Sequence, residues 1–253
     1  MGDRVALVTG GGRGIGRSIA LGLAGDGIEV AITYKRDAES AAETVAEIEA
    51  MGRAALAIQA DVSVPDDNTR TVAEVIGRFG GLQIVVNNGG IASRGRAVVD
   101  TEPEELLRVV STHALGPHHL LSQAVPHLRA NDRADIVVIS SVATLSHGAN
   151  GGPYNMGKAA LESLAFTLAK EERANGIRVN IVAPGLVETE MGKRLVKGAA
   201  GIDDITSLND RMPFGRVCQP SDIADAVRFF VSDAGAYVTG EKLNVWGGGQ
   251  DWR

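Results

Sequence analysis

The fold of this chain is decided by the stretch Thr9-Gly10-Gly11-Gly12-Arg13-Gly14-Ile15-Gly16, which joins a strand-like apolar run, residues 5–9, to a helical pattern over residues 14–25. Glycine lets the backbone turn sharply at such a junction and approach a ligand closely. The helix that follows offers free N–H groups and the positive end of its dipole to an anion. The stretch therefore predicts a phosphate-binding turn, with a merely tight strand–helix turn as the alternative.

Strand-like and helical patterns alternate along the rest of the chain. Strands are predicted at residues 5–9, 28–34, 55–60, 82–87, 135–141, 177–183 and 242–245. Helices are predicted near residues 14–25, 38–51, 66–79, 103–128, 153–174 and 221–232. The strand runs are continuously apolar, which is typical of strands buried on both faces. We therefore expect an α/β fold, a Rossmann-like doubly wound parallel sheet of about seven strands with helices on both faces, whose ligands bind at the carboxyl ends of the strands.

Composition narrows the class of protein. The 253 residues are 44% hydrophobic, which suits one domain over residues 1–253. The net charge of −6 argues against a nucleic-acid partner. No apolar run approaches the ~18 residues that cross a bilayer, so no membrane partner is expected. Cys218 is the only cysteine, which leaves no disulfide framework and no thiolate metal site, and we expect a cytoplasmic protein.

Cations follow the second predicted strand, which ends in Tyr34-Lys35-Arg36, and Arg13 lies within the glycine stretch. An acid at this strand end would bind a ribose 2′-hydroxyl, whereas Arg or Lys accommodates a 2′-phosphate. Asp37 comes only after both cations. The pattern favours NADP(H), with NAD(H) as the alternative. Lys35 and Arg36 are otherwise a solvated surface pair.

Tyr154 and Lys158 are spaced to share one face of a helix. A nearby cation lowers the pKa of a tyrosine, so Tyr154 is expected to exchange a proton with a carbonyl or alcohol oxygen. Ser141 ends the fifth predicted strand, where its hydroxyl can reach the same oxygen. On spacing alone, an ordinary surface pair on a helix stays an equal alternative.

Taken together, these motifs resemble the short-chain dehydrogenase/reductase family over nearly the whole chain. The family's Thr-Gly-x-x-x-Gly-x-Gly cradle, Asp-Val pair, Asn-Asn-Ala-Gly segment, Ser, Tyr-x-x-x-Lys and Pro-Gly-x-x-x-Thr segment all find counterparts in order. The coenzyme contacts that this resemblance implies are Gly10, Arg13, Gly14, Ile15, Gly16, Tyr34, Lys35, Arg36, Asp61, Val62, Asn88, Gly89, Gly90, Tyr154, Lys158, Pro184, Gly185, Val187 and Thr189.

The resemblance also implies the chemistry. Tyr154 is expected to be the general acid/base, Lys158 to lower its pKa and hold the nicotinamide ribose, and Ser141 to orient the substrate oxygen. Hydride transfer would interconvert a ketone or 3-oxoacyl group with a secondary alcohol, without a metal. The substrate would be a small carbonyl or alcohol compound, or a thioester of acyl carrier protein or CoA. By analogy with the family, the protein would be a homotetramer, for which Trp246 and Trp252 are candidate interface anchors.

Two positions depart from the family pattern. Gly89 replaces Ala, which loosens the loop. His113 stands where the family has an Asn that helps to hold a proton-relay water. His113 is interpreted as a substitute within a working relay, as a plain buried histidine, or as a sign of altered activity. The last reading supports the rival function, a dinucleotide-binding sensor or scaffold without turnover. Pro117 is expected to interrupt the helix before His118 and His119, which disfavours a metal site.

The segment at about 186–216 resembles the family's variable substrate-covering region. Its apolar side chains are sufficient for a lid that excludes water. They are Met191, Leu195, Val196, Leu208, Met212 and Phe214. Ordinary packing of a short helical excursion is the alternative for each of them.

Overall fold

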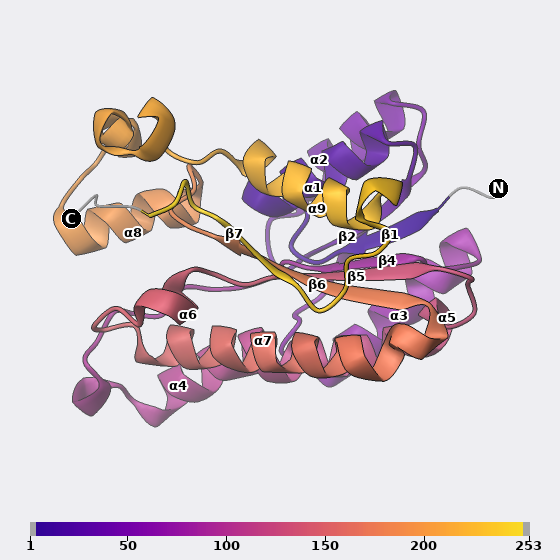
Figure 1. Cartoon of the computed structure of the whole chain (residues 1–253), viewed down its shortest axis with the longest axis horizontal. Coiled ribbons are helices and arrows are strands. Elements are labelled where there is room, and N and C mark those ends of the chain that lie inside the picture. Colours follow the sequence, from indigo (N-terminus) through magenta and orange to yellow (C-terminus); the bar gives the residue numbers. More distant parts are fainter. Residues whose placement is uncertain (1–3, 250–253) are drawn as a thin grey trace.

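The computed structural model describes residues 4–249 and contains one parallel sheet of seven strands (Figure 1). Its order is β3-β2-β1-β4-β5-β6-β7, and each neighbouring pair is parallel. The strands are β1 (Val5–Val8), β2 (Glu29–Tyr34), β3 (Ala55–Gln59), β4 (Ile84–Asn87), β5 (Ala134–Ile139), β6 (Ile177–Pro184) and β7 (Lys242–Val245). The order turns back at β1, from which the chain runs outward on both sides. This confirms the predicted doubly wound fold class. Trp252 lies outside the described residues.

Helices cover both faces of the sheet. In Figure 1, α1 (Gly14–Gly25), α2 (Ala38–Ala50) and α9 (Pro220–Val231) lie on one side. The other side carries α3 (Pro65–Phe79), α4 (Pro103–Val110), α5 (Gly116–Leu128) and α7 (Gly152–Glu172). Each helix layer packs on the sheet and encloses an apolar core. The strand β1 is apolar throughout because its side chains alternate between the two cores. Ala6 and Val8 belong to one core, and Val5 and Leu7 to the other.

Short helices complete the chain, and apart from the helical excursion considered for residues 186–216 they were not predicted from the sequence. They are α6 (Ala143–Ser146), α8 (Glu190–Ala200), and the 3₁₀ turns η1 (Val98–Asp100), η3 (Arg173–Asn175), η4 (Ile205–Arg211), η5 (Pro213–Gly215) and η6 (Asp233–Gly235). The α8–η4 region has a small apolar cluster of its own that includes Val196, Leu208 and Met212. Across residues 4–249, every helix is too short or too polar to span a bilayer.

The helix predicted over 103–128 is divided by a single π-helical turn, η2 (Ser111–Leu115). The N–H of Gly116 donates to the carbonyl of Ser111, five residues back, so the helical ladder widens by one residue. The expectation that Pro117 interrupts the helix is wrong, because the backbone stays right-handed helical on both sides of it. Pro117 lacks only the N–H that would otherwise bond the carbonyl of His113. The π turn thus absorbs the proline without breaking the helix.

Three arginines converge on one carboxylate at the amino ends of the strands. Asp135 on β5 is 2% exposed and forms ion pairs with Arg4 and Arg178 at 2.5 Å and with Arg133 at 3.6 Å. Arg4 and Arg133 also donate to the carbonyl of Val231 at the end of α9. This cluster bonds the end of α9 to the sheet, at the edge opposite the glycine turn of residues 9–16.

Replacing Asp135 by alanine should destabilise the protein by about 3 kcal/mol or more, because three guanidinium groups lose their shared counter-charge in a buried place. Urea unfolding measures the change. Asp233→Ala is the matched control, since Asp233 pairs with Arg133 but is 99% exposed, and its loss should cost less than about 1 kcal/mol. Equal losses for the two variants would contradict this account of the cluster.

Candidate active site

The glycine turn joins β1 to α1 at the carboxyl edge of the sheet and is bonded to the segment that follows β4. Gly10 has φ +64°, a conformation that favours glycine. The side-chain amide of Asn88 donates to the carbonyl of Thr9 at 2.9 Å, and the backbone N–H groups of Asn88 and Gly89 donate to the Thr9 hydroxyl at 2.9 and 2.8 Å. The segment after β4 therefore fixes the turn after β1.

Close packing explains the glycines at the start of α1. Gly14 has φ +55°, and a Cβ there would lie 3.4 Å from the methyl group of Thr189. At Gly16 a Cβ would lie 2.2 Å from the carbonyl oxygen of Gly10 and 2.5 Å from the amide nitrogen of Asn88. The first turn of α1, including Ile15, is thereby held against the strand end, and its free N–H groups can hold a phosphate.

A cationic corner lies at the ends of β2 and β3, beside a pocket of about 360 Å³. Lys35, which was expected to bind a 2′-phosphate, forms an ion pair with Asp61. Burial opposes ionisation of Asp61, but hydrogen bonds from Lys35 and Ser63 hold its pKa below the ordinary value. Arg36 has no ion-pair or side-chain hydrogen-bond partner within residues 4–249. Arg13 is 65% exposed and lies 4.0 Å from Asp37.

Sequence reasoning missed two members of this corner. Arg70 and Asp67 on α3 line the same pocket. Arg70 donates to the carbonyl of Gln59 and to Asp67, and Asp67 accepts from the N–H of Asp61 at 2.8 Å. The signal was present in the sequence, since both residues lie in the first turns of the helix that follows Asp61. The corner can hold the adenosine end of a dinucleotide.

Ser141, Tyr154 and Lys158 lie together at the carboxyl edge of the sheet. Ser141 comes two residues after β5, and the other two lie on successive turns of α7, which starts with Pro153 in its first turn. The Ser141 hydroxyl faces the phenol of Tyr154 closely enough to favour the ionised form of the phenol. Lys158 is 4% exposed and donates from Nζ to the carbonyl of Ile139 at 2.7 Å. Its Nζ lies 5.8 Å from the centroid of the Tyr154 ring.

Burial dominates the electrostatics of this cluster. It lowers the pKa of Lys158 to about 8, against the opposing charge of Glu162. It also raises the pKa of Tyr154, although the hydrogen bond with Ser141 opposes the rise. The expected lowering of the Tyr154 pKa by Lys158 is therefore not found. The physical reason is that Nζ bonds the Ile139 carbonyl and not the phenol oxygen.

His113 is 1% exposed and packs edge-on against Tyr154, with ring centroids 5.2 Å apart. Its Nε2 lies 2.7 Å from the carbonyl oxygen of Ile91. Burial, with Lys158 nearby, lowers the pKa of His113 to about 3, so the imidazole is neutral. The backbone nitrogen of Ile91 lies 3.3 Å from the same Nε2, but a carbonyl oxygen can only accept, so we assign the proton to Nε2, which donates to Ile91. Gly90 and Gly157 make room for the ring, because a Cβ would lie 2.7 Å from Cε1 or 2.9 Å from Cβ of His113.

The segment that follows β6 also lies at this edge of the sheet. Pro184 ends β6, and the N–H of Gly185 donates to the carbonyl of Val245 on β7. Val187 forms an isolated bridge with Cys218. Thr189 caps α8, accepting from the N–H of Gly192 at 3.0 Å, and its methyl group faces Gly14. This segment thus runs past the glycine turn on its way into the α8 region.

The remaining candidates lie on other segments of the chain. Val62 lies on the loop after β3, and its carbonyl accepts a hydrogen bond from the side-chain amide of Asn68. His118 and His119 are exposed on α5, and their rings pack edge-on against each other. In the described part of the chain, no group of three metal-binding side chains is close enough to hold an ion.

Comparison with known proteins identifies the family. A family model described as Enoyl-(Acyl carrier protein) reductase matches residues 10–250. The chain is 37% identical over 248 residues to 3-oxoacyl-(acyl-carrier-protein) reductase FabG of Staphylococcus aureus strain Mu50, which covers 96% of each protein. The chain therefore belongs to the short-chain dehydrogenase/reductase family, and the predicted family and the predicted oxidoreductase class are confirmed.

Solved structures agree with this assignment. A short-chain dehydrogenase from Burkholderia cenocepacia J2315, in complex with NADP, is 38% identical, with a TM-score of 0.87 over 98% of this chain and 97% of that one. Levodione reductase is 27% identical, with a TM-score of 0.91 over 97% of each chain. The fold is thus shared over nearly the full length.

The glycine packing gives a direct test of the cradle. Gly16→Ala should weaken dinucleotide binding at least about tenfold, because its Cβ cannot fit beside the carbonyl of Gly10 without moving the turn. Gly25→Ala, at the other end of α1, has nothing within 4 Å of its Cβ and serves as the control. Fluorescence titration with NADPH measures both. Unchanged binding in Gly16→Ala would rule out this turn as the dinucleotide site.

Proposed function

We propose that this protein is an NADP(H)-dependent reductase that interconverts a ketone, in particular a 3-oxoacyl thioester, with a secondary alcohol. One observation carries the proposal. The neighbouring hydroxyl groups of Ser141 and Tyr154 lie at the same sheet edge as the glycine turn, and the buried Lys158 has its Nζ 5.8 Å from the Tyr154 ring centroid. Two hydroxyl groups side by side can hold one substrate oxygen between them. The FabG relative supports a 3-oxoacyl thioester carried on acyl carrier protein, and a CoA thioester is the alternative.

The described residues fit a bound dinucleotide. The pyrophosphate would lie on Gly10, Gly14 and the free N–H groups of α1, and the adenosine in the corner at Asp61. Arg36, whose guanidinium group has no partner within residues 4–249, and the loosely paired Arg13 are available for a 2′-phosphate. The NADP bound by the Burkholderia relative supports the same preference. When bound, NADPH supplies the hydride.

The residues of the chain supply the proton side of the reaction. As the new C–H bond forms at the carbonyl carbon, negative charge develops on the oxygen, and the phenol of Tyr154 donates its proton to it. The Ser141 hydroxyl donates a second hydrogen bond to the same oxygen. The cationic Lys158 stabilises the tyrosinate that remains until a proton returns from solvent. The carbonyl thereby becomes an alcohol, because its carbon gains a hydride and its oxygen gains a proton.

In this proposal His113 is a positioning residue of a working enzyme. Its Nε2–H ties the π turn to Ile91, and its ring supports Tyr154 from the side. A neutral, tethered imidazole does not disturb the charge of the cluster. The rival function, a sensor without turnover, has no further support in the chain, and the turnover experiment below separates the two.

We propose that residues 186–216 cover the substrate within a single domain of residues 1–253. The apolar side chains of this segment divide into two groups. Val196, Leu208 and Met212 are buried in the small cluster under α8. Met191 and Leu195 on α8 and Phe214 are 43%, 51% and 89% exposed. The exposed group supports a cover for an acyl chain, which buries such side chains when it binds.

We also propose a homotetramer in the cytoplasm. Exposed apolar side chains of α4, the π turn and α7 support self-association, since Leu107, Leu115 and Met156 are 63%, 49% and 55% exposed. The single cysteine, Cys218, suits a reducing compartment.

Replacement of Tyr154 by phenylalanine tests the reaction. NADPH oxidation with 3-oxoacyl thioesters and simple ketones should fall at least about 100-fold, because the acid that protonates the oxygen is lost. NADPH binding, followed by nicotinamide fluorescence, should be unchanged. If the unaltered protein binds NADPH but oxidises it with no member of the panel, the sensor function is favoured.

Replacement of Arg36 by alanine tests the coenzyme preference. The dissociation constant for NADPH should rise about tenfold or more, because a charge-assisted hydrogen bond contributes about 1.5–3 kcal/mol, while that for NADH should hardly change. Lys35→Ala is the control, since the ion pair with Asp61 makes Lys35 a support of the corner, and its loss should affect both coenzymes alike. Equal losses for NADPH and NADH in Arg36→Ala would refute the assignment.

A further inference from the structure

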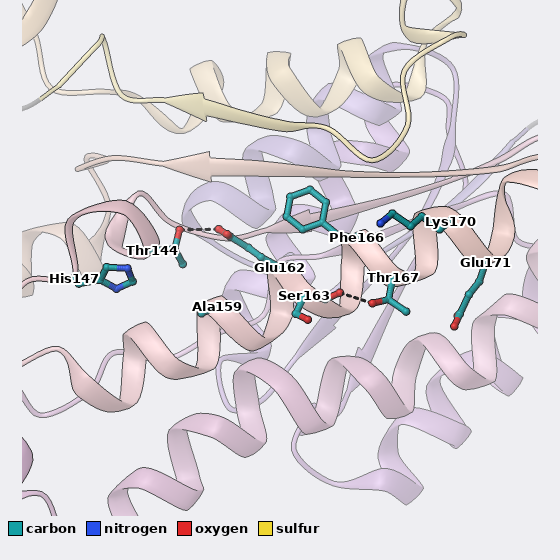
Figure 2. A pocket seen from close by; sticks show the side chains of 9 residues that line it. All are labelled: Thr144, His147, Ala159, Glu162, Ser163, Phe166, Thr167, Lys170 and Glu171. Carbon is teal, nitrogen blue, oxygen red and sulfur yellow. Dashed lines mark hydrogen bonds between the residues drawn. The ribbon is translucent and has the colours of Figure 1, made fainter.

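A partly buried carboxylate lies one helical turn beyond Lys158. Glu162 on α7 has a side chain that is only 12% exposed, and it faces the turn that follows β5. Figure 2 shows Glu162 pointing from α7 toward Thr144, at one end of a pocket of about 640 Å³. No residue of the proposed reaction requires this carboxylate as a proton donor or acceptor. Its hydrogen bonds, however, connect it to the turn that carries Ser141.

Glu162 holds both sides of Ser141 in the sequence. Its Oε1 accepts from the hydroxyl of Ser140 at 2.5 Å and from the hydroxyl of Thr144 at 2.8 Å. The Thr144 hydroxyl also lies 2.9 Å from the carbonyl oxygen of Ser141. The turn that carries Ser141 is therefore bonded to the helix that carries Tyr154 and Lys158. A shift of this turn would change the distance between the Ser141 and Tyr154 hydroxyl groups.

The last strand joins the same cluster. Lys242 on β7 is 14% exposed and donates from Nζ to Thr144 Oγ1 at 2.6 Å and to Glu162 Oε2 at 3.0 Å. Glu162 thus has one cation on each side, Lys242 from β7 and Lys158 from its own helix. The negative charge of Glu162 favours the charged form of Lys158, whose pKa burial otherwise lowers. Lys242 offsets part of that charge.

We propose that Glu162 and Lys242 are positioning residues of the reductase site, which fix the turn that carries Ser141 and set the charge balance next to Lys158. The inference rests on the proposed reductase function. Neither residue touches the reacting atoms. Both act through Ser140, Thr144 and Lys158.

Two substitutions of opposite charge effect test the inference. Several charged and titratable groups surround Glu162. They are Tyr154 and Lys158 on α7, His113 on the π turn, Lys242 on β7, and His147, Lys170 and Glu171 around the pocket. In Glu162→Gln the amide keeps the shape but loses the charge, so the high-pH limb of kcat for ketone reduction should move down by about one pH unit. In Lys242→Gln the charge of Glu162 is no longer offset, so the limb should move up.

The expected split in the kinetic constants adds a second readout. Glu162→Gln should lower kcat several-fold at neutral pH, because Ser141 and Lys158 are both affected, and should leave NADPH binding unchanged. Glu171→Gln is the matched control, since it makes the same chemical change on an exposed residue of α7 that lines the same pocket. Its pH profile and kcat should equal those of the unaltered protein. Thermal melting of each variant shows that the fold is retained.

The outcomes separate the inference from the function on which it rests. If the unaltered protein reduces no ketone, the proposed function fails. If it is active and the two limbs move in opposite directions, the inference is supported. If both limbs move the same way, or neither moves while the proteins stay folded, Glu162 and Lys242 have only a structural role and the inference is overturned.

Discussion

The parallel arrangement of the seven strands is the constraint on which the rest of this structure depends. Because every strand points the same way, the loops after β1, β4, β5 and β6 all emerge at one edge of the sheet. That edge receives the glycine turn, the Asn88 segment, the Ser141 turn and the Pro184–Gly185 corner. Residues far apart in the sequence become neighbours there without any loop having to travel far. The opposite edge carries the arginine cluster around Asp135, which serves packing and not chemistry.

Within that edge, burial and charge are balanced by hydrogen bonds that reach between elements. The buried ammonium group of Lys158 is stabilised because the Ile139 carbonyl accepts a hydrogen bond from it and because the Glu162 carboxylate lies one helical turn away. His113 is neutral for the same reason that the pKa of Lys158 is low, since both are removed from water. Desolvation also raises the pKa of the Tyr154 phenol, and the neighbouring Ser141 hydroxyl opposes the rise. A site of this kind keeps its proton donor protonated at neutral pH.

The sequence was sufficient for features that are written locally. The strands, the glycine turn and the spacing of Tyr154 and Lys158 follow from short patterns and were placed within a few residues. Features that join distant segments could not be read in this way. The Lys35–Asp61 pair links β2 to the loop after β3, and Glu162 meets Lys242 across the fold. The π turn arises where Gly116 packs against the carbonyl of Val62, a tertiary contact that the helical pattern does not reveal. The direction of the Tyr154 pKa depends on burial, which spacing alone does not give.

The central claim is that a hydride from the coenzyme reaches the carbonyl carbon of a substrate held by Ser141 and Tyr154. The most direct measurement uses NADPH that carries deuterium at both C4 positions of the nicotinamide, with a 3-oxoacyl thioester as substrate. Mass spectrometry of the product should find one deuterium on the carbon that bears the new hydroxyl group. A product labelled at any other carbon, or coenzyme oxidation that leaves no label in the product, would contradict the account.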